Sequence, residues 1–243
     1  MKIAIDRELR STQVDPELRI KPVSLLELFQ EAAENHTTQV GLKTQDLLEQ
    51  GFGWMMYKMA VRVEAWPRLG DPLRLRTWST GIKGYRALRE FDIHLGDRPA
   101  VVASSLWFAV DLQAGRIQRI PEDMGSVYAV EPPSTAYFDL KAWKPEPFPG
   151  GGCKTDIGVR PSDFDPYGHV NNAVYLDYLD AALNRQGRSL YRAAEIRILF
   201  RQGITPGTEQ VDVETTGSTE AALFRIGSGD TVFAEGRLVW PSP

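Results

Sequence analysis

The chain has 243 residues, which is enough for one large domain or for two domains of about 120 residues each. Its 32 acidic and 28 basic side chains give a formal net charge of −4, which argues against nucleic acid as the main partner because phosphate backbones attract basic surfaces. The single cysteine excludes an internal disulfide framework, and the sequence shows neither a secretion signal nor an apolar run long enough to cross a membrane, so we expect a cytoplasmic protein.

The first predicted element is an amphipathic helix that follows the pair Asp15-Pro16. Apolar residues recur there with the i, i+3, i+4 and i+7 spacing that places side chains on one face of a helix. These residues are Leu25, Leu28, Phe29 and Ala32. We expect this face to pack on a sheet, and we expect His36 to lie at the surface, at the C-terminal end of the helix.

Strands are predicted after this helix. Residues 55–66 alternate between apolar and more polar side chains, which is the period of a half-buried strand. The side chains expected to share one face are Met55, Tyr57, Met59, Val61 and Val63. Residues 72–78 and 87–110 predict further strands, and the pair Gly96-Asp97 predicts a hairpin turn inside the second segment.

A change in composition then divides the chain. Residues 131–153 contain five prolines and three consecutive glycines, which cannot sustain a helix or a central strand. We therefore predict an N-terminal domain over residues 1–130, a linker over residues 131–153 and a C-terminal domain over residues 154–243.

The second half repeats the first at an offset of 150 residues. The apolar positions of the first helix recur as Tyr175, Tyr178, Leu179 and Ala182. Strands are predicted over residues 194–202, 209–216 and 221–240, with Gly229-Asp230 at the last bend. One helix followed by an antiparallel meander, occurring twice, indicates an α+β duplication.

The segments before the two helices differ in their polar residues. The second helix is preceded by a polar set that consists of Asp163, Asp165, His169, Asn171 and Asn172. In the first half, Arg19, Lys21 and Pro22 stand where the second half has its histidine and two asparagines. The duplicated frame therefore does not need the polar set, whereas the aspartate is shared with Asp15.

This polar set suits acyl transfer from an activated ester or thioester. Unpaired N–H groups at the start of a helix can stabilise an oxyanion, and a carboxylate beside them can act as nucleophile or position a water molecule. A histidine can orient the reactants or transfer a proton. Turn formation and helix capping are the structural alternative for each Asp and Asn taken singly.

The segment SDFDPYGHVNNAVYLDYLDAA, residues 162–182, resembles the signature of hotdog-fold thioesterases. Two such halves in one chain resemble the acyl-acyl carrier protein (acyl-ACP) thioesterases of bacteria and plant plastids, and residues 54–78 are similar to that family's strand, turn and strand. The resemblance implies a tandem (double) hotdog, each half a central helix packed on an antiparallel sheet. It also implies hydrolysis of fatty acyl-ACP to free fatty acid and carrier-protein thiol, without a metal or another cofactor.

The resemblance also implies roles for individual residues. Asp165 and His169 match the family's catalytic aspartate and histidine, and we add Asn171 to this catalytic set. Substrate contacts are predicted for Asn172, Tyr167 and Gln202. Two positions depart from the family pattern, because Tyr167 replaces an asparagine of the plant branch and Gln202 or Gly203 stands where a glutamate is expected. The first half is expected to hold the acyl chain.

The expected partner is acyl carrier protein with its phosphopantetheine-linked acyl chain, and pairing into a homodimer is left open. An acyl-CoA thioesterase and a non-catalytic acyl-thioester sensor are the alternative functions. Two basic groups are candidates for a surface that docks the acidic carrier protein. They are Lys83, Arg86 and Arg89 in the first half, and Arg185, Arg188, Arg192, Arg197 and Arg201 in the second. Cys153 is interpreted as a spare thiol, and the acyl chain length is not predicted.

Overall fold

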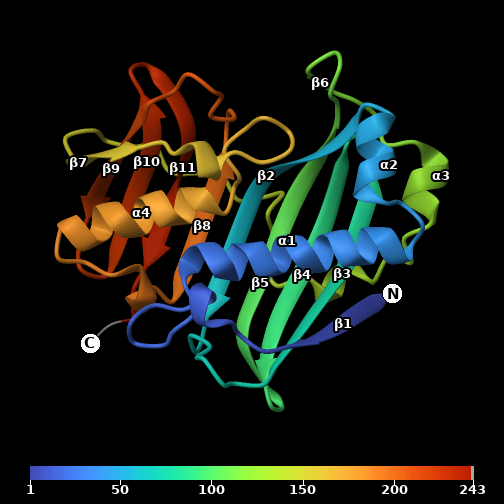
Figure 1. Ribbon diagram of the computed structural model, residues 1–243, viewed down its shortest axis with the longest axis horizontal. Helices are drawn as coiled ribbons and strands as arrows, with labels where there is room; N and C mark the ends of the chain where they lie inside the picture. Colours follow the sequence, from blue (N-terminus) through green and yellow to red (C-terminus); the bar gives the residue numbers. More distant parts are fainter. Residues whose placement is uncertain (242–243) are drawn as a thin grey trace. The chain divides into compact units, whose positions relative to one another are not determined.

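The computed structural model describes residues 1–241, which group into two compact units (Figure 1). Unit 1 comprises Met1–Ile20 and Glu27–Ala142, and unit 2 comprises Lys21–Leu26 and Trp143–Pro243. The division after Ala142 falls within the segment that the sequence marks as a linker. In Figure 1 each unit consists of one long helix lying across an antiparallel sheet.

Unit 1 is built on the sheet order β1-β3-β4-β5-β2, with β6 paired to the end of β5. Its strands are β1 (Lys2–Arg7), β2 (Phe52–Val63), β3 (Leu73–Lys83), β4 (Arg86–Leu95), β5 (Arg98–Asp111) and β6 (Arg116–Ile117). Its helices are α1 (Pro22–Gln39), whose first residues group with unit 2, α2 (Thr44–Glu49), α3 (Glu122–Ser126) and the 3-10 turns η1 (Ser11–Gln13) and η2 (Pro133–Thr135).

Unit 2 has the sheet order β7-β9-β10-β11-β8, which repeats the order of unit 1 strand for strand. Its strands are β7 (Cys153–Gly158), β8 (Glu195–Phe200), β9 (Gln210–Gly217), β10 (Ala221–Ser228) and β11 (Thr231–Val239). Its helices are α4 (Val174–Arg185) and the 3-10 turns η3 (Pro161–Asp163) and η4 (Leu190–Arg192). The predicted duplication of an α+β unit is therefore confirmed, and both predicted hairpin bends lie between paired strands.

The sequence analysis missed the strands that open each unit, β1 and β7. Both are edge strands with mostly exposed side chains, since β1 pairs only with β3 and β7 pairs only with β9. Short, charged edge strands carry a weak apolar alternation. Cys153 begins β7 and has an exposed free thiol.

The apolar faces of both long helices pack on their sheets as predicted. All eight side chains of the two predicted faces are at most 4% exposed. On α1 the ring of Phe29 lies 4.9 Å from the ring of Phe91 in β4, and on α4 the ring of Tyr175 meets Phe200 of β8 edge-on at 5.3 Å. Burial of these faces removes apolar surface from water and stabilises the packing of each helix on its sheet.

The predicted alternation along β2 is wrong for its first half. The pairing of β2 with β5 shifts register between Met56 and Lys58, so Tyr57 forms a β-bulge. The extra residue inverts the facing of the strand before it, and Met55 is 40% exposed whereas Met56 is 2% exposed. Beyond the bulge Met59, Val61 and Val63 are buried as predicted.

His36 is not a surface residue, contrary to the sequence-based expectation. The helix continues to Gln39, and the His36 side chain is fully buried against β4. Its Nδ1 accepts a hydrogen bond of 2.8 Å from Arg89, and burial together with the Arg89 charge lowers the pKa of His36 to about 4. Arg89 is itself buried, which removes it from the predicted docking surface.

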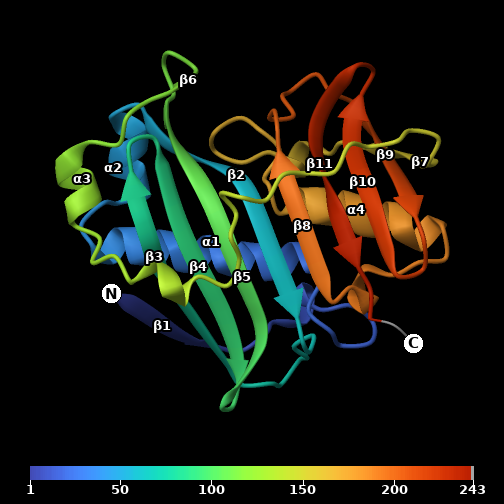
Figure 2. The same ribbon diagram turned by 180° about the vertical axis from the view of Figure 1, so that it is seen from behind.

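The first part of the predicted linker packs against unit 1. Residues 131–142 pass over the sheet face opposite to α1, which is the face seen in Figure 2. Glu90 alternates with Arg89 along β4 and therefore points to this face. It accepts hydrogen bonds from the Tyr137 backbone N–H at 3.0 Å and from Thr80 at 3.3 Å, and burial raises its pKa to about 7.

Glu90 makes the stability of unit 1 depend on pH. Its folded-state pKa lies above the ordinary value of 4.5, so the folded state binds the proton more tightly than the unfolded state. We expect the free energy of unfolding to fall by up to about 3 kcal/mol as the pH rises from about 4.5 to 7. Chemical denaturation of the wild type and of Glu90→Gln across this range measures the effect. The two stability curves should converge at low pH, and parallel curves would contradict the expectation. Exposed Glu64→Gln is the matched control.

Candidate active site

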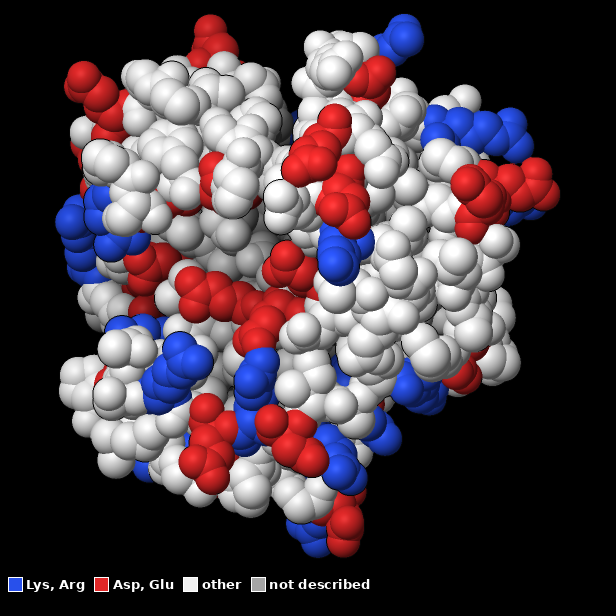
Figure 3. Space-filling view, turned by 45° about the vertical axis from the view of Figure 1, so that its right-hand side comes forward, with Lys and Arg blue, Asp and Glu red and all other residues white. Residues whose placement is uncertain are grey.

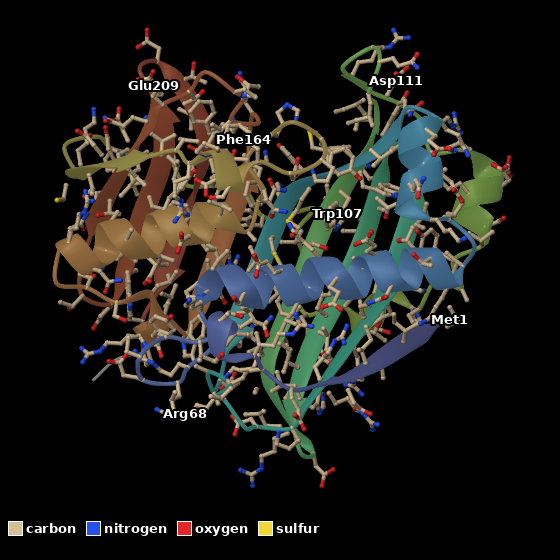
Figure 4. All side chains as sticks on the ribbon, viewed as in Figure 1. Met1, Arg68, Trp107, Asp111, Phe164 and Glu209 are labelled. Carbon is tan, nitrogen blue, oxygen red and sulfur yellow. The ribbon has the colours of Figure 1, made fainter. Side chains whose placement is uncertain are left out.

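The polar residues before α4 lie in one closed turn, residues 160–172, which we call the site turn. The Asp165 N–H donates to the His169 carbonyl at 2.8 Å, and the Gly168 N–H donates to the Asp165 carbonyl at 3.0 Å. Gly168 has a φ of 77°, a left-handed conformation that glycine adopts at little cost. Phe164, labelled in Figure 4, pairs with Val170 and closes the turn.

The same turn occurs in unit 1 as residues 10–22, which we call the equivalent turn. The Asp15 N–H donates to the Arg19 carbonyl at 2.8 Å, and the Leu18 N–H donates to the Asp15 carbonyl at 2.9 Å. Leu18 has a φ of 63°, although it carries a side chain, and Val14 pairs with Ile20. The backbone frame therefore depends on neither histidine nor asparagine.

The carboxylate of Asp15 is fully engaged within the equivalent turn. Its Oδ1 accepts the Arg19 backbone N–H at 2.8 Å, and its Oδ2 accepts the Arg19 Nε at 2.9 Å. Burial alone would raise the pKa of Asp15, but the hydrogen bonds and positive charge of Arg19 outweigh it and hold the pKa below its ordinary value. This aspartate is a stable anion with no reactive oxygen.

Asp165 stands at the same place in a different environment. Its Oδ1 accepts the backbone N–H groups of Tyr167 at 2.9 Å and of His169 at 3.4 Å. Its Oδ2 accepts no hydrogen bond from residues 1–241. Burial raises the pKa of Asp165, and the two N–H groups oppose this only in part. The exchange of Arg19 for His169 thus leaves a half-buried carboxylate with one oxygen available.

His169 follows Asp165 in the site turn, and the charge of its protonated ring would lower the pKa of Asp165. The side chain is exposed and packs against the backbone of Gly203. A Cβ at position 203 would lie 2.5 Å from the ring carbon Cδ2 of His169. A glutamate, which the family resemblance suggests for position 202 or 203, would therefore collide with the ring at 203. Because Gly203 has no side chain, the imidazole of His169 can occupy this space.

The two asparagines mark the start of α4 and differ in their contacts. Asn171 Oδ1 accepts the Ala173 backbone N–H at 2.8 Å, and the Asn171 N–H donates to the Asp163 carbonyl at 2.9 Å. Asn171 therefore forms the turn directly before α4, which is a structural alternative stated above. Neither the backbone N–H nor the side-chain amide of Asn172 donates a hydrogen bond to residues 1–241, so both donors are available beside the helix start.

The other two predicted residues lie at the edges of the site. Tyr167 is half-buried, and its backbone N–H is held by Asp165. Gln202 has an exposed side chain, and its backbone N–H donates to the Phe233 carbonyl at 3.3 Å. The site turn thus brings Asp165, Tyr167 and His169 together, with the asparagines next to them, whereas Gln202 reaches the site only through its neighbour Gly203.

The hydroxyl groups of Tyr178 and Tyr175, which support the site turn, were not predicted from the sequence. Asp163 is 3% exposed and accepts the Tyr178 hydroxyl at 2.6 Å and the Arg160 backbone N–H at 2.8 Å, so it is a structural residue. The Tyr175 hydroxyl accepts the Ile204 backbone N–H at 3.3 Å. A signal was present, because Leu25 and Leu28 occupy the corresponding positions of α1 and carry no hydroxyl.

The arginines predicted as a docking surface of unit 2 are mostly engaged. The backbone carbonyls of Asp156 and Ser218 accept Arg185 and Arg188, and the carboxylates of Glu195 and Glu235 bind Arg197 and Arg201. Arg192 is exposed. Over the face shown in Figure 3, basic side chains are interspersed with acidic ones.

Within residues 1–241, no three His, Cys, Asp or Glu side chains gather closely enough to bind a metal ion. No helix in that range is long and apolar enough to cross a membrane.

Most of the chain matches a known family. Residues 5–128 match the acyl-ACP thioesterase N-terminal domain, and residues 151–236 match the acyl-ACP thioesterase C-terminal domain. The chain belongs to the acyl-ACP thioesterase family, and its fold is the tandem hotdog that the sequence resemblance predicted.

Individual relatives agree with this assignment. A chloroplastic palmitoyl-acyl carrier protein thioesterase of Arabidopsis thaliana is 27% identical over 263 residues, covering 96% of this chain. The chain spans between 44% and 62% of the length of the first plant relatives it matches. A structure described as an oleoyl thioesterase from Lactobacillus plantarum superimposes with a TM-score of 0.86 at 20% identity, covering 100% of this chain and 98% of its own. The 12:0-ACP thioesterase of Umbellularia californica gives 0.82 at 17% identity, covering 99% and 97%. These two likenesses establish the fold.

Replacing His169 by arginine should restore the ion pair of the equivalent turn. In His169→Arg the guanidinium is expected to bind Asp165 as Arg19 binds Asp15, raising the free energy of unfolding at neutral pH by about 0.5–1 kcal/mol. The gain should be lost as the pH falls through the lowered pKa of Asp165, because a protonated carboxyl cannot form the pair. Urea denaturation measures both effects, with His169→Gln as the control. Equal stability of the two variants at pH 7 would contradict the comparison between the turns.

Proposed function

We propose that this protein hydrolyses fatty acyl-ACP to free fatty acid and carrier-protein thiol, and that the reaction takes place at the site turn of unit 2. Family membership supports the class of substrate. The observation that carries the proposal is the available Oδ2 of Asp165, in a turn whose equivalent in unit 1 has the same backbone and a fully engaged aspartate.

The available oxygen can act in two ways, and both use the same residues. As a general base, Asp165 takes a proton from a water molecule while the water oxygen bonds to the thioester carbon. As a nucleophile, Asp165 bonds to that carbon itself, and water then hydrolyses the resulting anhydride. In both routes the carbonyl oxygen becomes an oxyanion, for which the unengaged N–H groups of Asn172 are available. The sulfur leaves as a thiolate, and His169 supplies its proton.

The remaining predicted residues act around this reaction. Asn171 contributes by forming the turn before α4 and so fixing the place of Asn172. Tyr167 and Gln202 stay predicted substrate contacts. Unit 1 is proposed to hold the acyl chain. Arg185, Arg192 and Arg201 are the exposed members of the basic group proposed to meet the acidic carrier protein, and Arg201 is paired with Glu235.

Two further properties are proposed from the sequence. The cytoplasmic location rests on the single cysteine, whose thiol is free and exposed, and the plant relatives are chloroplastic proteins. A homodimer stays an open prediction that the oligomeric state in solution decides.

The proposed function is tested by comparing acyl-ACP with acyl-CoA as substrates, and by comparing substitutions at Asp165 and at Asp15. Purified protein should release free acid from acyl-ACP with a higher kcat/KM than from acyl-CoA with the same acyl chain, measured over several chain lengths. Asp165→Asn should lower kcat/KM by at least about 10²-fold, because the amide cannot accept the proton or attack the carbon. Asp15→Asn is the matched control and should retain the wild-type rate.

The outcomes separate the alternatives. A preference for acyl-CoA would indicate an acyl-CoA thioesterase, whose acyl chain is carried by a small nucleotide and not by a carrier protein. Binding of acyl thioesters without hydrolysis by the wild type would support a sensor. The rate should also fall as the pH drops through the raised pKa of Asp165, which lies above the ordinary 3.8, since both routes need the ionised carboxylate.

A further inference from the structure

The segment that follows β8, residues 202–204, supports the imidazole of His169 through Gly203. Gly203 contacts the ring, and a Cβ there would lie 2.5 Å from His169 Cδ2. The carbonyl of the next residue, Ile204, accepts the Val170 backbone N–H at 2.9 Å. Residues 202–204 are therefore joined to both the side chain of His169 and the backbone directly after it.

The hydroxyl of Tyr175 fixes this segment from α4. It accepts the Ile204 backbone N–H at 3.3 Å and makes a longer contact of 3.5 Å to the Gln202 carbonyl. The ring is 1% exposed and meets Phe200 edge-on, at an interplanar angle of 88°. Neither the ring nor the hydroxyl has freedom to leave this place without displacing buried neighbours.

The hydroxyl also lies within the field of the proposed reactive carboxylate. Burial raises the pKa of Tyr175, the Ile204 N–H opposes this, and the negative charge of Asp165 raises the pKa further. The phenol is therefore a neutral donor at every pH at which the enzyme is expected to work. The hydroxyl links residues 202–204, in which Gly203 contacts His169, to helix α4.

The first half of the chain shows that the duplicated frame does not need this hydroxyl. Leu25 is fully buried at the position of Tyr175, and Pro67 stands at the position of Ile204. The Ile20 N–H donates to the Pro67 carbonyl at 2.8 Å, as the Val170 N–H donates to Ile204. The segment is thus held in the same way in unit 1, but proline has no N–H and leucine has no hydroxyl. Both groups are present only beside Asp165 and His169.

We propose that Tyr175 is a positioning residue for the proposed thioester hydrolysis, whose hydroxyl fixes residues 202–204 and thereby the place of the His169 ring beside Asp165. The inference rests on the proposed function for its kinetic consequence. Its structural part concerns the ring alone. Proton transfer requires donor and acceptor within hydrogen-bond reach, so a ring that moves on a looser segment transfers the proton less often.

The kinetic arm uses Tyr175→Phe, which removes the hydroxyl and retains the packed ring. We expect kcat for acyl-ACP to fall about tenfold, with KM changed by less than about twofold, because substrate binding does not involve the hydroxyl. The matched control is Tyr137→Phe in unit 1, which removes a hydroxyl that donates to Asp92 Oδ2 at 2.7 Å. Its kcat should stay at the wild-type value.

The spectroscopic arm reads the ring directly. The chain has three histidines, and His36 is fully buried, so the exposed His169 can be assigned by NMR of ring-labelled protein. Its ring signals should shift in Tyr175→Phe, and also in Gly203→Ala, where the added Cβ collides with the ring. They should not shift in Tyr137→Phe.

The two arms distinguish the inference from the function it rests on. A wild type that hydrolyses no acyl thioester would refute the proposed function, while the ring signals would still decide whether Tyr175 positions His169. Unchanged His169 signals and unchanged kcat in Tyr175→Phe, with only a lower melting temperature, would overturn the inference. The hydroxyl would then serve only to satisfy the buried N–H of Ile204.

Discussion

One aspartate occurs in the same turn of both units, and its hydrogen bonds distinguish the two units. In unit 1 the guanidinium and backbone of Arg19 engage both carboxylate oxygens of Asp15. In unit 2 the same turn carries a histidine, and Asp165 keeps one oxygen without a partner among residues 1–241. The opposite directions of the two pKa shifts follow from this exchange. Tyr175, Gly203 and Asn172 are proposed to assist a reaction at this available oxygen.

This arrangement divides stability and chemistry between the two copies. An aspartate with a lowered pKa stabilises the folded state at neutral pH, whereas a half-buried aspartate with a raised pKa destabilises it. Unit 1 therefore has the more stable form of the turn, and unit 2 has the form that leaves one carboxylate oxygen available for the proposed reaction. A protein of marginal stability tolerates such a site only where the surrounding frame is well determined. Here the frame is determined by a turn that closes equally well without the polar residues.

Much of the fold follows from patterns that are local in the sequence. The spacing of Leu25, Leu28 and Phe29 predicted the buried face of α1, and its recurrence predicted α4 and the duplication. The β-bulge at Tyr57 could not be read, because alternation on both sides of it is regular and only the pairing with β5 reveals the extra residue. His36 was misplaced because its burial depends on Arg89, a residue distant in sequence. The polar set of the site was found by comparing the two halves, but the free oxygen of Asp165 and the contact between Gly203 and His169 are properties of the folded turn.

Direct measurement of two carboxyl groups in one sample tests this account most sharply. Titration of the wild-type protein by carbon-detected NMR, with labelled aspartate, reports the pKa values of Asp15 and Asp165 under identical conditions. The account predicts a value below 3.8 for Asp15 and a value above 3.8 for Asp165. Equal values, or a lower value for Asp165, would show that the histidine leaves the carboxylate as well stabilised as the arginine does. That result would contradict the assignment of the reactive oxygen to unit 2.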